Sequence, residues 1–307
     1  MTCVPIILMC HELYDADVSY SNPAQARTIS NHEIMHVFGA ESATKSGKRI
    51  RVRTVSLTAL LPVRRLPGGV TPVSNLTDLL SDCIPNDHCR QVTSRQLATS
   101  LCAYLKGVRQ IMDLGCGEGE SCDLFRKIAP RAHWIGLDIA GSSHTTKPLG
   151  ADSRIATYDG TRMPFADGCM DLIYCNQVLE HVRHTREVLK EVCRVLGPGG
   201  RFIGSTSHLE PFHACSVWNY TPYGFRVLIE EAGLQLLEIR PGIDALTLII
   251  RRGLGSPAFF ARWWDRESPL NRAIGFYGRL TGKPHCWVNS AKLQFCGQFG
   301  FIAQRWE

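Results

Sequence analysis

The chain has 307 residues, of which 44% are hydrophobic and 20% are charged, and its formal net charge is +6. This apolar fraction excludes a disordered chain, and a chain of this length can bury enough surface to fold without disulfides or metal ions. No apolar run approaches the roughly 18 residues that cross a bilayer, so we expect no transmembrane segment.

The first part of the chain, residues 1–92, lacks a complete fold pattern, and we expect it to form a poorly defined N-terminal extension. It is irregular and rich in Ser, Thr, Asn and Pro. An apolar run at 3–10 has no basic segment before it, so it makes a poor signal peptide. The whole chain has 13 cysteines, an odd number without a CxxC pair, which indicates reduced thiols. Together these features predict a cytoplasmic protein.

One pattern in the extension is typical of zinc peptidases. The sequence HEIMH at 32–36 fits HExxH, in which two His one helical turn apart bind zinc. Ser42 stands where the extended motif has a His, and only about 30 residues precede the motif, too few for the usual supporting sheet. We therefore expect no peptidase activity.

A second pattern is a basic segment between Lys45 and Arg65, which holds seven basic residues and no acidic one. Such a segment attracts phosphate or a membrane surface, whereas the simpler interpretation is a solvated arm. No aromatic side chains interleave with the charges for base stacking, so we expect no nucleic-acid partner. Peripheral contact with a membrane stays open.

From about residue 93 the sequence alternates between helix-like and strand-like segments. Apolar residues at helical spacing predict helices, and short apolar runs between polar residues predict strands. This alternation favours a parallel sheet with helices on both faces. In chain order we predict a helix at 94–105, a strand at 108–114, a helix at 120–128, strands at 132–139, 154–158 and 170–176, a helix at 182–196 and a strand at 200–205.

A glycine-rich turn, DLGCGEG at 113–119, follows the first predicted strand. Glycines at this place let the backbone approach a ligand closely. Asp138 ends the second predicted strand, where an acidic side chain can accept hydrogen bonds from both ribose hydroxyls. In open α/β sheets both places lie at the carboxyl ends of the strands, where ligands bind. The turn and the acid together predict a nucleotide-like ligand.

These motifs resemble those of the class I S-adenosylmethionine-dependent methyltransferases, most closely the ubiquinone and menaquinone biosynthesis methyltransferases. The stretches 158–182 and 189–205 are similar to the family's adenine-binding region and to the helix and fifth strand that follow it. The resemblance implies an α/β fold with a doubly wound, seven-stranded, mostly parallel sheet in a methyltransferase domain at 93–307. It also implies an enzyme that moves a methyl group from S-adenosyl-L-methionine to a small-molecule acceptor.

The resemblance also implies cofactor contacts for individual residues. The glycine-rich turn would line the methionine end, the acid of the second strand would bind the ribose, and a pair after the third strand would lie at the adenine. Tyr158 stands where relatives usually have Gly, so the adenine pocket has a different shape. The predicted cofactor-binding residues are Asp113, Gly115, Gly117, Gly119, Asp138, Ile139, Asp159, Gly160 and Asn176.

Glu180 and His181 follow the fourth predicted strand and are the candidate catalytic pair. His181 would act as a general base if the acceptor carries a proton of high pKa, such as a hydroxyl. The alternative is that the pair orients the start of a helix, where an acid is favoured. In the quinone-pathway O-methyltransferases that this segment resembles, a Glu three residues before the pair helps to hold a divalent metal. Gln177 replaces that carboxylate here, so we expect no metal.

A polar and aromatic loop follows the fifth predicted strand and leads into a helix at 222–232. In the family that the chain resembles, such a loop borders the acceptor site. Four of its residues are therefore candidate acceptor contacts, with simple loop packing as the alternative for each. They are His208, His213, Tyr220 and Tyr223.

The region at about 242–290 is longer than the family's link between its last two strands, and it is rich in apolar and aromatic residues. We interpret it as a mostly helical insertion that caps the cleft, followed by a final antiparallel strand at 293–303. A large apolar cap suggests a hydrophobic acceptor, and a lid that packs its own aromatic core is the alternative. The rival function is a non-catalytic protein that uses the cofactor fold to bind a partner. The oligomeric state stays open.

Overall fold

A computed structural model of the chain describes residues 75–139 and 154–306. The chain divides into two compact units, Met1–Thr71 and Pro72–Glu307, and the described residues all belong to the second. The HEIMH sequence and the basic segment of the extension lie outside the described residues. Within the described ranges, no helix is long and apolar enough to cross a membrane.

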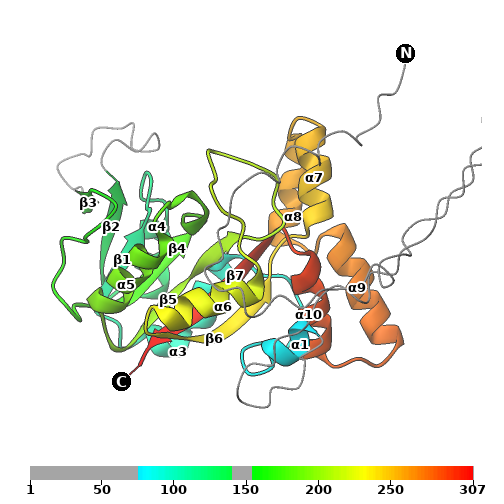
Figure 1. Cartoon of the computed structure of the whole chain (residues 1–307), viewed down its shortest axis with the longest axis horizontal. Helices are drawn as coiled ribbons and strands as arrows, with labels where there is room; N and C mark the ends of the chain where they lie inside the picture. Colours follow the sequence, from blue (N-terminus) through cyan, green and yellow to red (C-terminus); the bar gives the residue numbers. More distant parts are fainter. Residues whose placement is uncertain (1–74, 140–153, 307) are drawn as a thin grey trace, which may run out of the picture. The chain divides into compact units, whose positions relative to one another are not determined.

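The centre of the second unit is a seven-stranded sheet with the strand order β3-β2-β1-β4-β5-β7-β6 (Figure 1). β7 is antiparallel to both of its neighbours, and the other neighbouring pairs are parallel. This order confirms the predicted doubly wound, mostly parallel sheet. The strands are β1 at Gln110–Leu114, β2 at His133–Ile139, β3 at Ile155–Tyr158, β4 at Met170–Asn176, β5 at Leu196–Ser207, β6 at Leu234–Pro241 and β7 at Gln298–Arg305.

Helices cover both faces of this sheet close to their predicted positions. The predicted helix at 94–105 is wrong in one respect, because it is interrupted at Leu101, whose ψ of 21° is not helical. The hydroxyls of Thr99 and Ser100 bond back to carbonyls of the preceding turn, which competes with the helical ladder. These helices are α2 at Ser94–Ser100, α3 at Cys102–Leu105, α4 at Ser121–Ile128, α5 at Thr185–Val195 and α6 at Pro222–Glu231.

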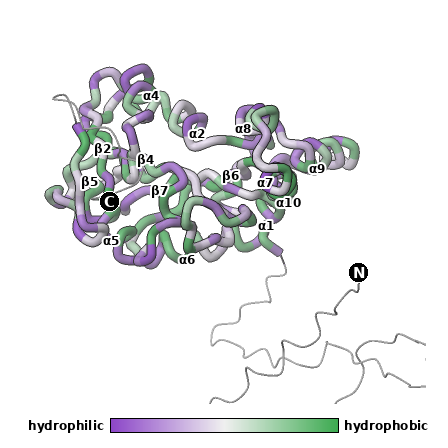
Figure 2. Tube along the Cα trace, turned by 90° about the horizontal axis from the view of Figure 1, so that it is seen from above, coloured by the Kyte–Doolittle hydropathy of each residue, from purple (hydrophilic) through white to green (hydrophobic). Residues whose placement is uncertain are grey.

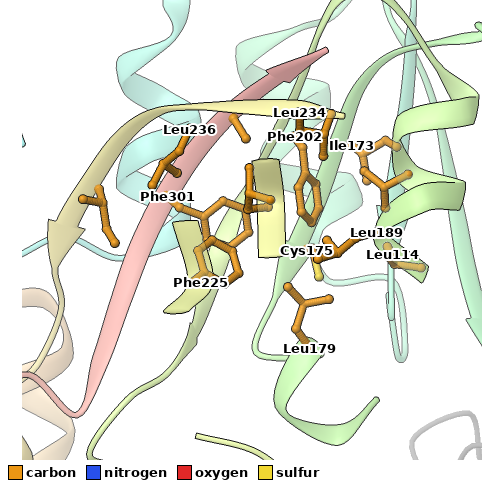
Figure 3. Close-up of a cluster of buried hydrophobic side chains, with 14 of the residues drawn as sticks. Leu114, Ile173, Cys175, Leu179, Leu189, Phe202, Phe225, Leu234, Leu236 and Phe301 are labelled. Atoms are coloured by element: carbon orange, nitrogen blue, oxygen red, sulfur yellow. The ribbon is translucent and has the colours of Figure 1, made fainter. Parts of the chain in front are cut away.

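The two faces of the sheet bury two hydrophobic clusters, because neighbouring residues of a strand point to opposite faces. The first cluster packs the sheet against α5 and α6 through Leu189 and Phe225 (Figure 3). The second packs it against α2 and α4 through Leu97 and Phe125. Burial on both faces is typical of parallel sheets with helical crossovers.

The insertion between β6 and β7 is helical, as its sequence predicts. Its last helix continues to Phe295, so the predicted strand at 293–303 starts too early. Buried residues of this helix at 288, 289, 292 and 293 follow the helical period, and β7 begins only after Gly297. The elements of this cap are α7 at Ala245–Gly253, a 3₁₀ turn at Ala258–Ala261, α8 at Arg262–Asp265, α9 at Pro269–Leu280 and α10 at His285–Phe295. Figure 2 shows them grouped at one end of the unit.

The segment before α2 packs on the same core, although it belongs to the extension in our sequence-based division at residue 92. The short helix α1 at Leu76–Leu79 is followed by Leu80, Cys83 and Ile84, which are buried in the first cluster. The carbonyl of Cys83 accepts a hydrogen bond from the backbone of Ile239 on β6 at 2.9 Å. The second compact unit therefore begins well before α2.

Gln91 joins this segment to the cap. Its side-chain Oε1 accepts hydrogen bonds from Ser268 N at 2.8 Å, from Ser268 Oγ at 2.9 Å and from Asn271 Nδ2 at 2.9 Å. Its Nε2 donates to the carbonyl of Trp263 at 2.7 Å, and its backbone N–H donates to Glu267 at 2.6 Å. Most of these groups are buried, where hydrogen bonds are strong and a lost partner is costly. One amide side chain thus holds both ends of the stretch 263–271.

Candidate functional site

The turn after β1 is held in a conformation that favours glycine. Its φ angles are +71° at Gly115, +51° at Gly117 and +82° at Gly119, in the left-handed region. A side chain at position 115 would also collide with Val178, since its Cβ would lie 2.4 Å from Val178 Cγ2. The turn therefore brings bare backbone to the carboxyl end of the sheet, as a ligand-binding turn requires.

A cavity of about 460 Å³ opens beside this turn. Small-molecule sites in proteins usually have volumes of roughly 300–1,000 Å³, so the cavity is large enough for a nucleotide-sized ligand. It is lined by four of the predicted cofactor residues: Asp113, Gly115, Gly117 and Asn176. Its lining also includes Arg95, Cys116, Glu118, Glu120, Ser121 and Tyr174. We call it the donor cavity.

Asp138, at the end of β2, ties the turn to the neighbouring strand. Its Oδ2 accepts a hydrogen bond from the backbone N–H of Gly117, and its Oδ1 accepts one from Ile139, each at 2.8 Å. Each oxygen of a carboxylate can accept more than one hydrogen bond. Asp138 therefore holds the turn in place, but it is buried and is not among the residues that line the donor cavity, so its contact with a ribose stays a prediction.

Asp113 lies under the turn at the end of β1 and is buried. Burial raises the pKa of its carboxyl group to about 7, although the hydrogen bond from Ser121 Oγ lowers it. Ser121 in turn accepts a hydrogen bond from Trp134 Nε1 at 2.9 Å. A Cβ at Gly119 would come within 3.3 Å of the same Trp134 ring. Asp113 and Gly119 therefore help to fix the shape of the turn, and Asp113 also lines the donor cavity.

The predicted adenine contacts lie after β3, beyond the lining of the donor cavity. Asp159 is exposed, and its Oδ1 accepts hydrogen bonds from the backbone N–H and the hydroxyl of Thr161 at 2.8 and 2.6 Å. These bonds lower the pKa of Asp159. Gly160 has a φ of +84°, and its α-carbon faces Ile139, which is half-exposed at the end of β2. The structure therefore brings Asp159 and Gly160 next to Ile139, and their contact with adenine stays a prediction.

A second cavity of about 270 Å³ adjoins the donor cavity and shares Arg95 and Asn176 with it. Trp264 and Asp265 of α8 form the part of its wall that the cap supplies. The other lining residues include apolar Val92, Ile243 and Phe299 and polar Gln177, Ser205 and Gln298. We call it the acceptor cavity because it meets the donor cavity at the end of β4.

Asn176 is held in place at this junction by two hydroxyl groups. Ser94 Oγ donates to its Oδ1 at 2.7 Å, and Ser205 Oγ donates to the same atom at 3.0 Å. The next residue, Gln177, has a φ of +56°, a strained value for a residue with a side chain. Such strain is often found where a functional site needs a particular backbone path.

Glu180 lies in the 3₁₀ helix at Leu179–His181 and is fully buried. Thr206 Oγ1 donates a hydrogen bond to Glu180 Oε2 at 3.0 Å, and Ser207 Oγ donates to Oε1 at 3.3 Å. Burial raises the pKa of Glu180 to about 7, and the hydrogen bonds oppose this rise. Its carboxyl group can therefore hold a proton near neutral pH.

His181 and His213 lie beside this carboxyl group. Ligand atoms of Glu180, His181 and His213 lie within 4.8 Å of one another, an arrangement that could hold a metal ion. The two imidazole rings meet edge to face with centroids 5.3 Å apart. The residues that line the donor and acceptor cavities do not include these three. A general-base role of His181 and the expected lack of a metal stay predictions.

The other predicted acceptor contacts also lie outside the lining of the acceptor cavity. The hydroxyl of Tyr220 is buried between Thr185 Oγ1 at 2.7 Å and the carbonyl of Leu179 at 2.8 Å, which is a packing role. His208 is partly buried, and burial lowers its pKa. Tyr223 is exposed on α6. Contact of these side chains with an acceptor stays a prediction.

Sequence reasoning missed the side chains that line the site from outside the motifs. Arg95 lines both cavities from α2, and Trp264 lines the acceptor cavity from α8. Arg95 had only a weak signal, an isolated cation near the start of an amphipathic helix. Trp264 belongs to an aromatic region that we assigned to the cap, without any indication of which residue faces the site.

The sheet order, the glycine turn and the adjoining cavities define a Rossmann-like methyltransferase domain. Residues 112–204 match the family model described as a methyltransferase domain. This range runs from β1 into β5 and holds the turn, Asp138 and Asn176.

Relatives of known name agree with this class. A probable S-adenosylmethionine-dependent methyltransferase of Mycolicibacterium smegmatis is 30% identical over 170 residues, which cover 54% of this chain and 65% of the relative. A thiol S-methyltransferase of Homo sapiens is 46% identical over 123 residues, which cover 37% of this chain and 48% of the relative. A ubiquinone/menaquinone biosynthesis C-methyltransferase of Desulfotalea psychrophila is 32% identical over 102 residues, which cover 32% and 41%.

The match to a methyltransferase domain and the names of these relatives confirm the resemblance to the S-adenosylmethionine-dependent methyltransferases that was read from the motifs. The cofactor of this family is S-adenosyl-L-methionine. The chain spans less than two thirds of the length of each of these relatives.

Proposed function

We propose that the protein transfers a methyl group from S-adenosylmethionine, bound in the donor cavity, to a small molecule bound in the acceptor cavity. The observation that carries this proposal is that the two cavities meet at Asn176 and Arg95. When two reactants are bound in adjoining cavities, the entropy cost of bringing them together is met by binding. This cost is a large part of the barrier to such a transfer.

The residues of the donor cavity fit this cofactor. The bare backbone at Gly115 and Gly117 accommodates its amino-acid end, and the guanidinium of Arg95 supplies a cation for its carboxylate. Outside the cavity lining, Asp138, which holds Gly117, would accept hydrogen bonds from the ribose hydroxyls, and Asp159 with Gly160 would contact the adenine. When bound, the cofactor supplies a methyl group on a positively charged sulfur that is already reactive.

The acceptor cavity limits the acceptor to a small molecule, or to the end of a larger one. Trp264, Ile243 and Phe299 supply apolar walls, and Ser205 and Gln298 supply polar groups that can orient it. This chain's residues would mainly align the acceptor and exclude water, since the methyl donor is reactive by itself. The likeness to the human thiol S-methyltransferase supports small thiols as the first acceptors to test.

The proposal is tested by titrating the full chain with S-adenosylmethionine in a calorimeter and by following a labelled methyl group into small thiols, phenols and amines. We expect saturable donor binding and transfer to at least one class. Gly115→Ala should abolish both, because its Cβ would collide with Val178. Gly253→Ala is the matched control, because no atom lies within 4 Å of its added Cβ.

Two results would argue against this function. A wild-type chain that binds no donor would remove the donor-site assignment. A chain that binds the donor tightly but transfers nothing to any acceptor class would favour the rival interpretation, a non-catalytic protein that uses the cofactor fold to bind a partner.

We also propose a cytoplasmic location, which is supported by the free cysteines among the described residues.

A further inference from the structure

The cap exposes an unusual number of large apolar side chains. Sixteen such side chains are exposed among the described residues, and nine of them lie between positions 245 and 295. Large apolar patches on a protein surface mark sites of interaction with other molecules. The nine are Leu246, Ile249, Ile250, Leu254, Phe259, Phe276, Tyr277, Leu280 and Phe295.

On α7 the exposed apolar residues form one stripe. Leu246, Ile249 and Ile250 are three and four residues apart, so they share a face, and Leu254 follows at the same spacing. The buried face of the helix carries Leu248 instead, which packs at Gly297 before β7. The helix is therefore apolar on the face that packs on the domain and on the face that does not.

On α9 the usual arrangement is reversed, with small and polar residues inside and large apolar ones outside. Its buried residues are Asn271, Gly275 and Gly278. Gly278 allows close approach to α10, since a Cβ there would lie 2.4 Å from Val288 Cγ2. Leu280 is 69% exposed and belongs to the exposed side of the helix. These large apolar side chains of α9 are not buried within the protein, so packing of the fold does not account for them.

The cap also exposes positive charge, part of which stacks on its own aromatic rings, with Arg262 over Phe259 and Trp263 and Lys283 over Trp287. Six basic residues of the cap are exposed, and Asp265 is its one exposed acidic residue among those the structure describes. Glu267 is paired with Lys292 at 2.8 Å, and Asp244 is buried as the N-cap of α7. In α9, Arg272, Phe276, Arg279 and Leu280 follow one helical stripe, so that cations alternate with apolar groups. The six exposed basic residues are Arg252, Arg262, Arg266, Arg272, Arg279 and Lys283.

We propose that this surface, formed by the nine apolar and six basic residues named above and here called the cap face, docks the protein on an anionic lipid membrane. Amphipathic helices bind the interface of a bilayer by inserting apolar side chains while basic side chains pair with anionic headgroups. The cap face offers both kinds of group on adjoining helices. Anionic lipids are concentrated in the cytoplasmic leaflet, which agrees with the proposed location.

Charge argues against a second copy of the chain as the occupant. A second copy docked through the same surface would bring the two sets of exposed cations together, which is unfavourable. A lipid surface of negative charge complements the cap face without this repulsion.

Docking on a membrane also gives the cap a role in choosing the acceptor, provided that the proposed function holds. Trp264 and Asp265 line the acceptor cavity and belong to the short helix α8, which lies between α7 and α9 in the chain. A bilayer at the cap face would therefore lie close to the elements that border that cavity. Acceptors dissolved in the membrane would then be favoured over those in free solution.

The test is sedimentation of the full chain with lipid vesicles, which needs no methyl transfer and so fails or succeeds independently of the proposed function. We expect binding to phosphatidylcholine vesicles that contain phosphatidylserine, and at least about tenfold weaker binding to phosphatidylcholine alone. Ile249→Glu and Leu280→Glu should each weaken binding by about tenfold or more, because each removes an inserted apolar side chain. Trp306→Glu is the matched control, an exposed apolar residue outside the cap, and should bind as the wild type does.

Charge variants keep the test valid if a glutamate at 249 or 280 disturbs folding. Arg252→Gln and Arg279→Gln lie on the surface, and each should weaken binding to anionic vesicles by about fivefold. Unchanged binding in all four cap variants would place the lipid contact elsewhere and overturn the proposal. The proposal also fails if the chain ignores vesicles but forms dimers that Leu280→Glu dissociates, since the cap face would then be a protein interface.

Discussion

On one side of Asn176 most of the site comes from one stretch of chain, with Arg95 and Tyr174 added from outside it, whereas on the other side the site is assembled from distant stretches. The donor cavity depends on the turn after β1 and on Asp138, which lie within 26 residues of one another. The acceptor cavity takes residues from α2, from the ends of three strands and from the cap, between Val92 and Phe299.

The donor side and the acceptor side therefore differ in the substitutions that they tolerate. The donor side relies on backbone conformation, so its glycines and its one bracing carboxylate leave little freedom. The acceptor side relies on side chains that pack from several elements, and such side chains can be exchanged while the fold persists. We therefore expect substitutions on the donor side to remove binding, and substitutions on the acceptor side to change preference.

The largest effect is expected from Asp138→Ala. The variant loses the proposed ribose contact and leaves the N–H of Gly117 without its carboxylate partner, which costs about 1–3 kcal/mol by itself. We expect donor affinity in calorimetry to fall by at least about tenfold. Asp123→Ala, which removes an exposed carboxylate paired with Arg126 on α4, should leave donor affinity unchanged. An unchanged affinity for Asp138→Ala would mean that the ribose assignment is wrong.

An intermediate effect is expected where the two sides meet. Arg95→Ala should raise KM for the donor by about tenfold, because a charge-assisted hydrogen bond is worth roughly 1.5–3 kcal/mol, and Arg95→Lys should recover part of the loss. Trp264→Ala should raise KM for the acceptor and leave donor affinity within about twofold. Steady-state kinetics with both substrates varied would measure the KM for the donor and the KM for the acceptor in each variant. If Trp264→Ala weakened the donor as much as Arg95→Ala does, the two cavities would not be separate subsites.

The smallest effect on donor binding is expected at Glu180, which affects stability instead. Burial raises its pKa from 4.5 to about 7, so between these values the folded protein holds a proton that the unfolded chain has released. The contribution of Glu180 to stability therefore falls as pH rises through this window, by at most about 1.4 kcal/mol per pH unit. The lowered pKa of His208 contributes with the opposite sign. Glu180→Gln should flatten this dependence in urea unfolding measured across the window.

Asp113 contributes a slope of the same sign, since its pKa is also raised to about 7, so the Glu180→Gln protein should keep part of the dependence. Donor affinity of the variant should match the wild type, because Glu180 does not line the donor cavity. A pH dependence of stability that is the same in Glu180→Gln and in the wild type across this window would contradict the buried, protonated state of Glu180.

The sequence predicted the positions of the strands, the glycine turn and Asp138 well because their signals are local. Predicted strand limits lie within a few residues of β1–β4, and the glycine turn and Asp138 occupy the expected strand ends. Local signals failed where tertiary packing decides. The residues at 293–295 have strand-like side chains, yet the buried face of α10 continues through Leu293. Arg95 and Trp264 carry no motif, so only the fold could bring them together.

The side-chain amide of Gln91 fixes the position of one wall of the acceptor cavity, which matters for how acceptor preference can evolve. It lies four residues before Arg95, and it holds Trp263 and Ser268 on either side of Trp264. A longer or shorter side chain at position 91 would shift the wall that Trp264 forms in the acceptor cavity. It would leave the glycine turn of the donor cavity unchanged. A substitution at position 91 is therefore expected to change which acceptor this protein prefers while the methyl donor stays the same.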